Sequence, residues 1–294
     1  MNSNFLKAAD RGRSRFKHYA LALLWIVVGL FGMSVISTLP ILAFRSIPGQ
    51  YVEESGLVFL SCTSQLLFAS FIYVSIAFIL LFVTFKIHQR SPKTLINIGE
   101  NIRFRRAIDG FFGWFLLRSV SSFLLFQFFS DRYALTDVAK IDLSVIGFGL
   151  IVSFSASLLA FISIAYVLQG THQLVKNPFL LVLGWIFVAT LILILTKQQF
   201  NLFSILLGTL NALLWLFILL KEEGIELNVG WLAADIFYSV FCVSTGISGL
   251  HNILSQCPSL IIARPVSQTI GIPLYIVQAI VFYYLLFVYP SKKI

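Results

Sequence analysis

Long uncharged runs separated by short polar segments dominate the chain. From Leu143 to Thr171 no residue carries a charge, and Lys176-Asn177-Pro178 follows this run. About 20 apolar residues are enough to cross the hydrocarbon core of a bilayer as a helix. Backbone groups in lipid must find their hydrogen bonds within the protein, and the alternating ten-residue strands of a membrane barrel are absent from the sequence. The run therefore predicts a membrane-spanning helix.

The same pattern recurs along the chain and predicts an all-α fold, a polytopic transmembrane helix bundle of about eight spans. We expect one integral membrane domain over residues 1–294, with two N-terminal spans in 1–85, a core in 86–250 and a C-terminal span in 251–294. The expected spans are Tyr19–Phe44, Ser55–Phe85, Phe111–Ser130, Leu143–Thr171, Phe179–Leu195, Leu202–Leu220, Gly230–Leu250 and Pro273–Val288.

The composition agrees with this pattern, since 59% of the residues are hydrophobic and only 11% are charged, against about a quarter charged in a soluble domain. The net charge of +9 lies mostly in a few loops, so we expect no nucleic-acid partner. If the N-terminus is inside, the inner segments hold fifteen Lys and Arg residues and the outer loops five. By the positive-inside rule, both termini are expected on the cytoplasmic side.

Two charges fall inside expected spans. Arg118 lies about eight residues into its span and Asp235 about five residues into its own, both from the inner side. At about 1.5 Å per residue these depths differ by one helical turn. An intramembrane charge usually has a partner or a function, so the two side chains are expected to form an ion pair. The alternative is that Arg118 extends to the headgroups while Asp235 stays near the interface.

The basic segment Arg103-Phe104-Arg105-Arg106 precedes the third expected span and predicts an interfacial, lipid-facing loop, with membrane lipids as partners. Known metal and nucleotide motifs are missing from the sequence: no two histidines have zinc spacing, and there is no Walker A loop or dinucleotide fingerprint. We expect no metal and no cofactor. Serines such as Ser153, Ser155 and Ser157 are expected to pack helices or to bond back to the helix backbone.

Three segments resemble the CPBP family, the CAAX proteases and bacteriocin-processing proteins also called Abi. They are Lys86–Asn97 with Arg103–Trp114, Tyr166–Gly170 with Lys176–Pro178, and Gly230–Ala234 continuing to Gly249. The resemblance covers roughly Lys86 to Leu250 and implies an intramembrane endopeptidase scaffold. It also implies a bacterial inner (plasma) membrane or a thylakoid-type membrane. Active members carry E-E-x-x-x-R, F-x-x-x-H and H-x-x-x-N motifs, whose acidic pair activates water while His and Asn hold the oxyanion.

The catalytic positions of that family are apolar in this sequence. Leu159 and Ala160 stand at the Glu-Glu positions, Ile164 at the Arg position, and Leu232 and Ile236 at the H-x-x-x-N positions. The resemblance therefore implies a pseudoprotease, a membrane-embedded binding or regulatory protein that holds a lipidated or hydrophobic ligand or another membrane protein. Two alternatives remain: an active endopeptidase with relocated catalytic residues, and a small transporter or channel subunit.

Overall fold

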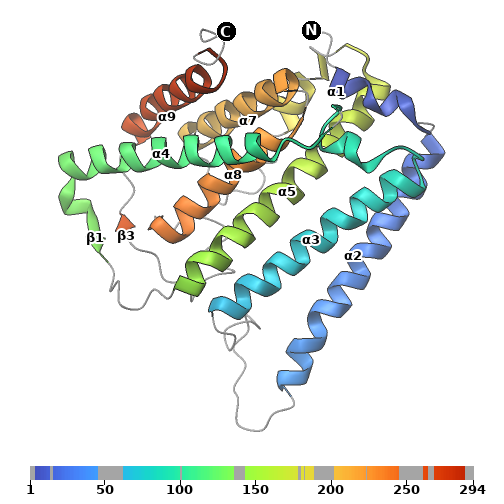
Figure 1. Cartoon of the computed structure of the whole chain (residues 1–294), viewed down its shortest axis with the longest axis horizontal. Coiled ribbons are helices and arrows are strands. Elements are labelled where there is room, and N and C mark those ends of the chain that lie inside the picture. The colour runs from blue at the N-terminus through green and yellow to red at the C-terminus, as the bar shows by residue number, and fades with distance from the viewer. Residues whose placement is uncertain are drawn as a thin grey trace.

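The computed structural model shows a bundle of helices with a small sheet at one end (Figure 1). The residues that it describes are 4–13, 16–45, 62–99, 101–135, 143–177, 180–181, 183–188, 202–222, 224–244, 261–263 and 268–288. The all-α fold class predicted from the hydrophobic pattern is confirmed.

The long helices correspond to seven of the eight expected spans, and more than half of the remaining one, Phe179–Leu195, lies outside the described residues. The long helices are α2 (Phe16–Arg45), α3 (Cys62–Lys86), α4 (Phe104–Phe128), α5 (Leu143–Leu174), α7 (Leu202–Glu222), α8 (Glu226–Phe237) and α9 (Gln268–Tyr283). π-Helical turns extend α8 over Tyr238–Cys242 and α9 over Tyr284–Val288. The short helical elements are α1 (Asn4–Lys7), η1 (Ala8–Arg11), η2 (Pro92–Leu95) and η3 (Ser130–Arg132).

Helices α4, α8 and α9 each begin four or more residues before the expected start. Helix α4 begins at Phe104, seven residues before the expected Phe111, so the basic segment belongs to the helix start and is not a loop. Helix α8 begins at Glu226 and its helical continuation ends at Cys242, where strand β2 (Val243–Ser244) follows. The expected end of that span at Leu250 lies outside the described residues.

Within the part of the chain that the structure describes, three helices are long and apolar enough to cross a membrane: Thr63–Lys86, Phe104–Phe128 and Leu143–Gln173. Two shorter apolar helical segments, Lys17–Met33 and Pro273–Val288, accompany them. Large apolar side chains cover the outer surface of α4, including Phe112, Leu116 and Phe123, each more than 60% exposed. A surface of this kind is suited to hydrocarbon, so the chain has the features of a membrane protein.

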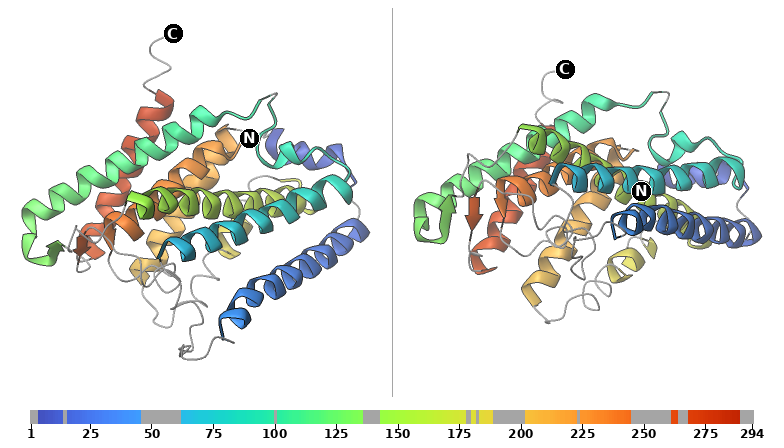
Figure 2. Two further views of the ribbon diagram at one scale, coloured as in Figure 1. Left: turned by 60° about the horizontal axis from the view of Figure 1, so that its bottom comes forward. Right: turned by 90° about the horizontal axis from the view of Figure 1, so that it is seen from below.

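The helices pack in a defined order. Helices α2, α3, α5 and α8 are neighbours in that sequence, and α4 crosses α8 on the far side, as Figures 1 and 2 show. Helix α9 packs on α4 and α7. Trp114, Trp231 and Phe282 form the aromatic centre between α4, α8 and α9, with Trp114 5.2 Å from Trp231 and 5.3 Å from Phe282 between ring centroids.

Two glycines allow α4 and α8 to approach each other closely. A Cβ atom on Gly230 would lie 1.8 Å from the Ala107 carbonyl oxygen, and one on Gly110 would lie 2.4 Å from the Leu227 carbonyl oxygen. Neither distance is possible for a real side chain, so the two backbones touch at this crossing. Small residues serve the same purpose at helix crossings in membranes, where close packing replaces the hydrophobic effect.

Segments that the sequence assigns to one side of the membrane meet at one end of the bundle. The turns after α3 contact the N-terminal segment, the end of α5 and the α7–α8 junction there (Figure 1). The backbone and side-chain contacts are Arg13 N to His88 O at 2.7 Å, Gln169 Nε2 to Thr94 O at 2.8 Å, and Ile225 N to Ile96 O at 2.8 Å.

A three-stranded sheet joins two segments that the sequence assigns to the other side to residues of the expected span Gly230–Leu250. Strand β3 (Ile261–Ala263) lies between β1 (Tyr133–Leu135), to which it is antiparallel, and β2, to which it is parallel. The register pairs Tyr133 with Ala263 and Val243 with Ile261. The sequence does not predict these strands, because two or three residues are too few to show an alternating pattern. The described segments between the helices thus make contacts at two ends of the bundle.

Candidate functional site

Three of the five positions that the expected resemblance assigns to catalytic residues lie around one cavity. Ala160 and Ile164 of α5 and Leu232 of α8 line one cavity of about 110 Å³. Leu159 and Ile236 do not line it. Helix α7 completes the wall of the cavity. The other lining residues are Phe161, Asn211, Trp215, Trp231 and Asp235.

The walls of this cavity carry few groups that could do chemistry. Asn211 accepts a hydrogen bond from the Tyr275 hydroxyl at 2.5 Å, and Trp231 Nε1 is buried without a hydrogen-bond partner among the described residues. Asp235 is the single carboxylate in the lining, and no histidine is present in it. An isolated carboxylate without a histidine or a second acid does not reproduce the family's arrangement for activating water.

The ion pair expected from helix depth is present. Arg118 Nε on α4 lies 3.3 Å from Asp235 Oδ1 on α8, and the two side chains are 34% and 36% exposed. The same oxygen accepts a hydrogen bond of 3.0 Å from Trp114 Nε1, and the Arg118 guanidinium lies 5.5 Å from the centre of the Tyr238 ring. The single carboxylate of the cavity is therefore neutralised and oriented by α4.

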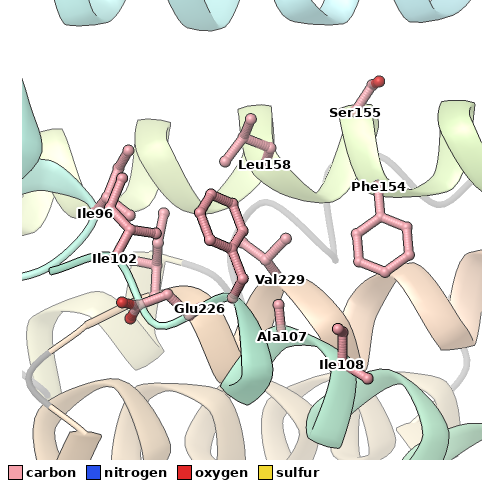
Figure 3. A pocket seen from close by; sticks show the side chains of 11 residues that line it. Ile96, Ile102, Ala107, Ile108, Phe154, Ser155, Leu158, Glu226 and Val229 are labelled. Atoms are coloured by element: carbon pink, nitrogen blue, oxygen red, sulfur yellow. The ribbon is translucent and has the colours of Figure 1, made fainter.

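A larger cavity of about 490 Å³ lies between α4, α5 and the start of α8 (Figure 3). Nearly all of its lining is apolar: in Figure 3, Phe154 and Leu158 belong to α5, Ala107 and Ile108 to α4, and Val229 to α8. The other lining residues are Ile96, Ile102, Phe104, Ser155, Ile225 and Glu226. Its volume lies within the range of small-molecule sites, about 300–1,000 Å³.

One end of the larger cavity is closed by a cluster of charges around Glu226. This carboxylate, 3% exposed, accepts hydrogen bonds from the Asn97 side-chain amide and, at 3.0 Å, from the Arg103 backbone N–H. Arg103 Nη2 lies 3.3 Å from Glu226 Oε2, and its Nη1 lies 3.2 Å from Glu222 Oε2. Arg106 Nη2 reaches Glu222 Oε1 at 3.0 Å. Three of the four carboxylate oxygens accept a hydrogen bond, and Glu222 Oε2 is buried without one, within ion-pair distance of Arg103.

This cluster changes the interpretation of the basic segment. Arg103 and Arg106, predicted to face lipid, also bind the carboxylates of Glu222 and Glu226, and Arg105 is exposed. These ion pairs were not predicted from the sequence. The available signal was that both acids lie in a segment assigned to the same side of the membrane as the basic segment.

The serines of the expected spans follow the predicted role. Ser153, Ser155 and Ser157 donate to the carbonyl oxygens four residues earlier, each at 2.7 Å. This confirms that they satisfy their hydrogen bonds within the helix. Among the described residues, no group of three or more His, Cys, Asp or Glu side chains is placed to hold a metal ion.

Comparison with models of protein families, with curated proteins and with solved structures gives no match for this chain. The cavities and the charged contacts are therefore the features that bear on its function.

Proposed function

We propose that this chain is a non-catalytic relative of CPBP-type intramembrane endopeptidases that binds a hydrocarbon chain in the α4–α5–α8 cavity. In this proposal it has eight spans with both termini on the cytoplasmic side of a bacterial inner membrane or a thylakoid-type membrane. The observation that carries the proposal is the 490 Å³ apolar cavity, which lies beside a charged cluster in a chain whose catalytic-like positions are apolar.

The shape of the cavity supports a ligand that enters from the membrane. Phe104 and Ile108 are 72% and 52% exposed at its α4 edge, where the outer face of the helix is apolar. A hydrocarbon chain could pass between α4 and α5 without crossing polar protein surface. Arg105 is exposed next to this edge, so an anionic headgroup attached to the chain would meet a positive charge there. An acyl lipid or a lipidated peptide fits this description.

The charged cluster argues against the relocated endopeptidase. Glu222 and Glu226 are the best acid pair among the described residues, but three of their four oxygens accept hydrogen bonds from arginine or amide donors. The fourth, Glu222 Oε2, lies 3.2 Å from Arg103 Nη1. A general base needs a lone pair directed at the attacking water. The grouping of loops at two ends supports the alternation of spans, and the loop charges support the proposed orientation.

A photoactivatable palmitate probe tests the binding proposal. In vesicles, the probe should label purified protein on α4 or α5 near Ile108 and Leu158. The Leu158→Trp variant, which fills the cavity, should lose most of the labelling. Leu116→Trp, an equal change on the exposed face of α4, should keep it. Equal labelling of both variants would exclude the cavity as the binding site.

A proteolysis assay tests the non-catalytic part separately. Wild-type protein is expected to leave prenylated and precursor peptides intact. Cleavage by purified protein that disappears in Asp235→Asn or Glu222→Gln would replace our proposal with the active endopeptidase. Liposome uptake of a solute, dependent on the protein, would favour the transporter.

A further inference from the structure

Arg90 is a buried cation that no carboxylate of the described residues approaches within ion-pair distance. The residue is 7% exposed, and its Nε is fully buried without a hydrogen-bond partner. None of its guanidinium N–H donors bonds to another residue in the part of the chain that the structure describes. Its electrostatic neighbours are the phenol groups of Tyr19 and Tyr166. A buried arginine is normally paired, because an unpaired charge in a low-dielectric site is costly.

The surrounding structure holds Arg90 in place. Gln89 has a φ of 50°, in the left-handed region, and this turn follows α3 directly. A Cβ on Gly12 would lie 2.5 Å from the His88 carbonyl oxygen and 3.1 Å from Arg90 Cβ, so the N-terminal segment packs against the stem of Arg90. A strained residue persists only where the surrounding structure fixes it, and such positions occur often at ligand sites.

His88 links the elements around Arg90. Its Nδ1 donates to the Arg13 carbonyl oxygen at 2.9 Å, since a carbonyl can only accept. Its Nε2 therefore accepts from the Tyr166 hydroxyl at 2.8 Å, and its ring lies 4.7 Å from that of Tyr19. Burial lowers the pKa of His88, which keeps the ring neutral. The imidazole thus joins α2, α5 and the N-terminal segment without supplying a negative charge.

The nearest acid on the N-terminal segment is already engaged. Asp10 Oδ1 accepts from Gln173 Nε2 at 2.6 Å and pairs with Lys176 Nζ at 3.2 Å. The flanking segments add positive charge, since they carry Arg13, Lys17 and Lys86. This region therefore has an excess of positive charge, which a bound anion would neutralise.

We propose that Arg90 forms the centre of a phosphate-binding site, and that its occupant is the phosphate of an anionic membrane phospholipid. The guanidinium matches phosphate geometry with two parallel N–H donors. The site follows the last residue of a spanning helix, Lys86, and lies beside Tyr19 near the start of another, which is the level of lipid headgroups. Anionic lipids attract basic segments at the cytoplasmic surface. The proposal does not depend on the α4–α5–α8 cavity.

The test is a titration of purified protein in zwitterionic detergent, free of phosphate, with short-chain phosphatidylglycerol and separately with inorganic phosphate. Thermal unfolding reports binding. Phosphatidylglycerol should raise the unfolding temperature of the wild type. In Arg90→Gln its Kd should increase at least about tenfold, the loss expected for a charge-assisted bidentate contact. Arg105→Gln removes the same charge from an exposed position and should bind like the wild type.

The arms separate the possible sources of phosphate. An equal shift from inorganic phosphate alone, again dependent on Arg90, would keep the phosphate site and overturn the lipid assignment. Phosphatidylglycerol binding that is as tight in Arg90→Gln as in the wild type, or no shift with either ligand, would overturn the site itself. Without ligand, Arg90→Gln should unfold at a temperature no lower than the wild type. If it fails to fold, Arg90→Lys, which keeps the charge but loses the planar fork, should show an intermediate Kd; a wild-type Kd would contradict the proposal.

Discussion

Two arginine sites at the same end of the bundle differ in how their charge is balanced. At the α4–α8 junction, Arg103 and Arg106 bind Glu222 and Glu226. Across α5, Arg90 is more deeply buried and no described carboxylate pairs with it. The charges of the first site are paired within the protein, and the pairs join the start of α4 to the α7–α8 junction. The second site requires an anion that the described chain does not supply. A buried charge therefore indicates a structural contact at the α4–α8 junction and a ligand site at Arg90.

This difference predicts that removing a charge affects the stability of the protein differently at the two sites. Neutralising a residue of the matched cluster should destabilise the protein, because the partner stays buried without its counter-charge. Neutralising Arg90 in the absence of ligand should not. The expected effects are therefore largest around the matched contacts and smallest beside Arg90.

The largest effect is expected at the helix crossing that supports the matched cluster. Gly230→Ala should lower the free energy of unfolding by more than about 3 kcal/mol, because its Cβ would overlap the Ala107 carbonyl oxygen on a rigid helix. Thermal unfolding in detergent measures this. Gly147→Ala on α5 is the control, since a Cβ at that position would meet no heavy atom within 4 Å; equal stability of the two variants would contradict a close crossing.

Within the cluster, Glu226→Gln should cost about 2 kcal/mol. The glutamine keeps the shape but leaves Arg103 with one carboxylate fewer, and the loss is moderated because the Arg103 side chain is 39% exposed. Chemical unfolding of the variant, compared with Asp109→Asn on α4, measures it. Asp109 has no charged partner among the described residues, so a similar loss there would show that net charge, and not pairing, is responsible.

The second matched contact, Arg118 with Asp235, should contribute less. A double-mutant cycle with Arg118→Leu and Asp235→Leu is expected to give a coupling energy of about 1 kcal/mol, since both side chains are about one third exposed. Additive effects on unfolding would mean that the contact does not stabilise the helix crossing.

The smallest effect is expected at His88, next to the unmatched arginine. Burial lowers its pKa below the ordinary value of 6.5. The unfolded chain therefore binds a proton more readily, and the contribution of His88 to stability is present above pH 6.5 and falls as the pH drops below it. Wild-type protein should lose more stability than His88→Gln between about pH 7.5 and about pH 5.5. Parallel curves for the two proteins would show that His88 is not buried in its neutral form.

Periodicity and depth along the chain are enough to predict most of the helical framework. Uncharged runs locate the long helices, and counting residues along the expected spans places Arg118 and Asp235 at similar depths. The expected resemblance assigns five positions to one site, and of these Ala160, Ile164 and Leu232 line one cavity while Leu159 and Ile236 do not. These predictions need only the rise of a helix, the order of spans and the family pattern.

The rest depends on contacts that a single sequence does not encode locally. Arg103 finds Glu226 across 123 positions of the chain, and Arg90 is buried only because the N-terminal segment folds over it. The prediction that Arg103 and Arg106 face lipid follows from their charge alone, without the partner that α8 provides. Contacts between residues far apart in the sequence decide which partners these arginines bind, and hydrophobic periodicity carries no information about such contacts.

The α4–α8 crossing also has a consequence for how the protein is made. Gly110 and Gly230 are 120 residues apart in the chain, and translation adds about 5–20 residues per second. During synthesis, roughly 6–24 s therefore pass between the appearance of α4 and that of α8. In that time the arginines of α4 lack the carboxylates that will neutralise them. During that interval the insertion machinery or lipid headgroups must shield the charges of α4. Mutations at this crossing should therefore first show their effect during biogenesis.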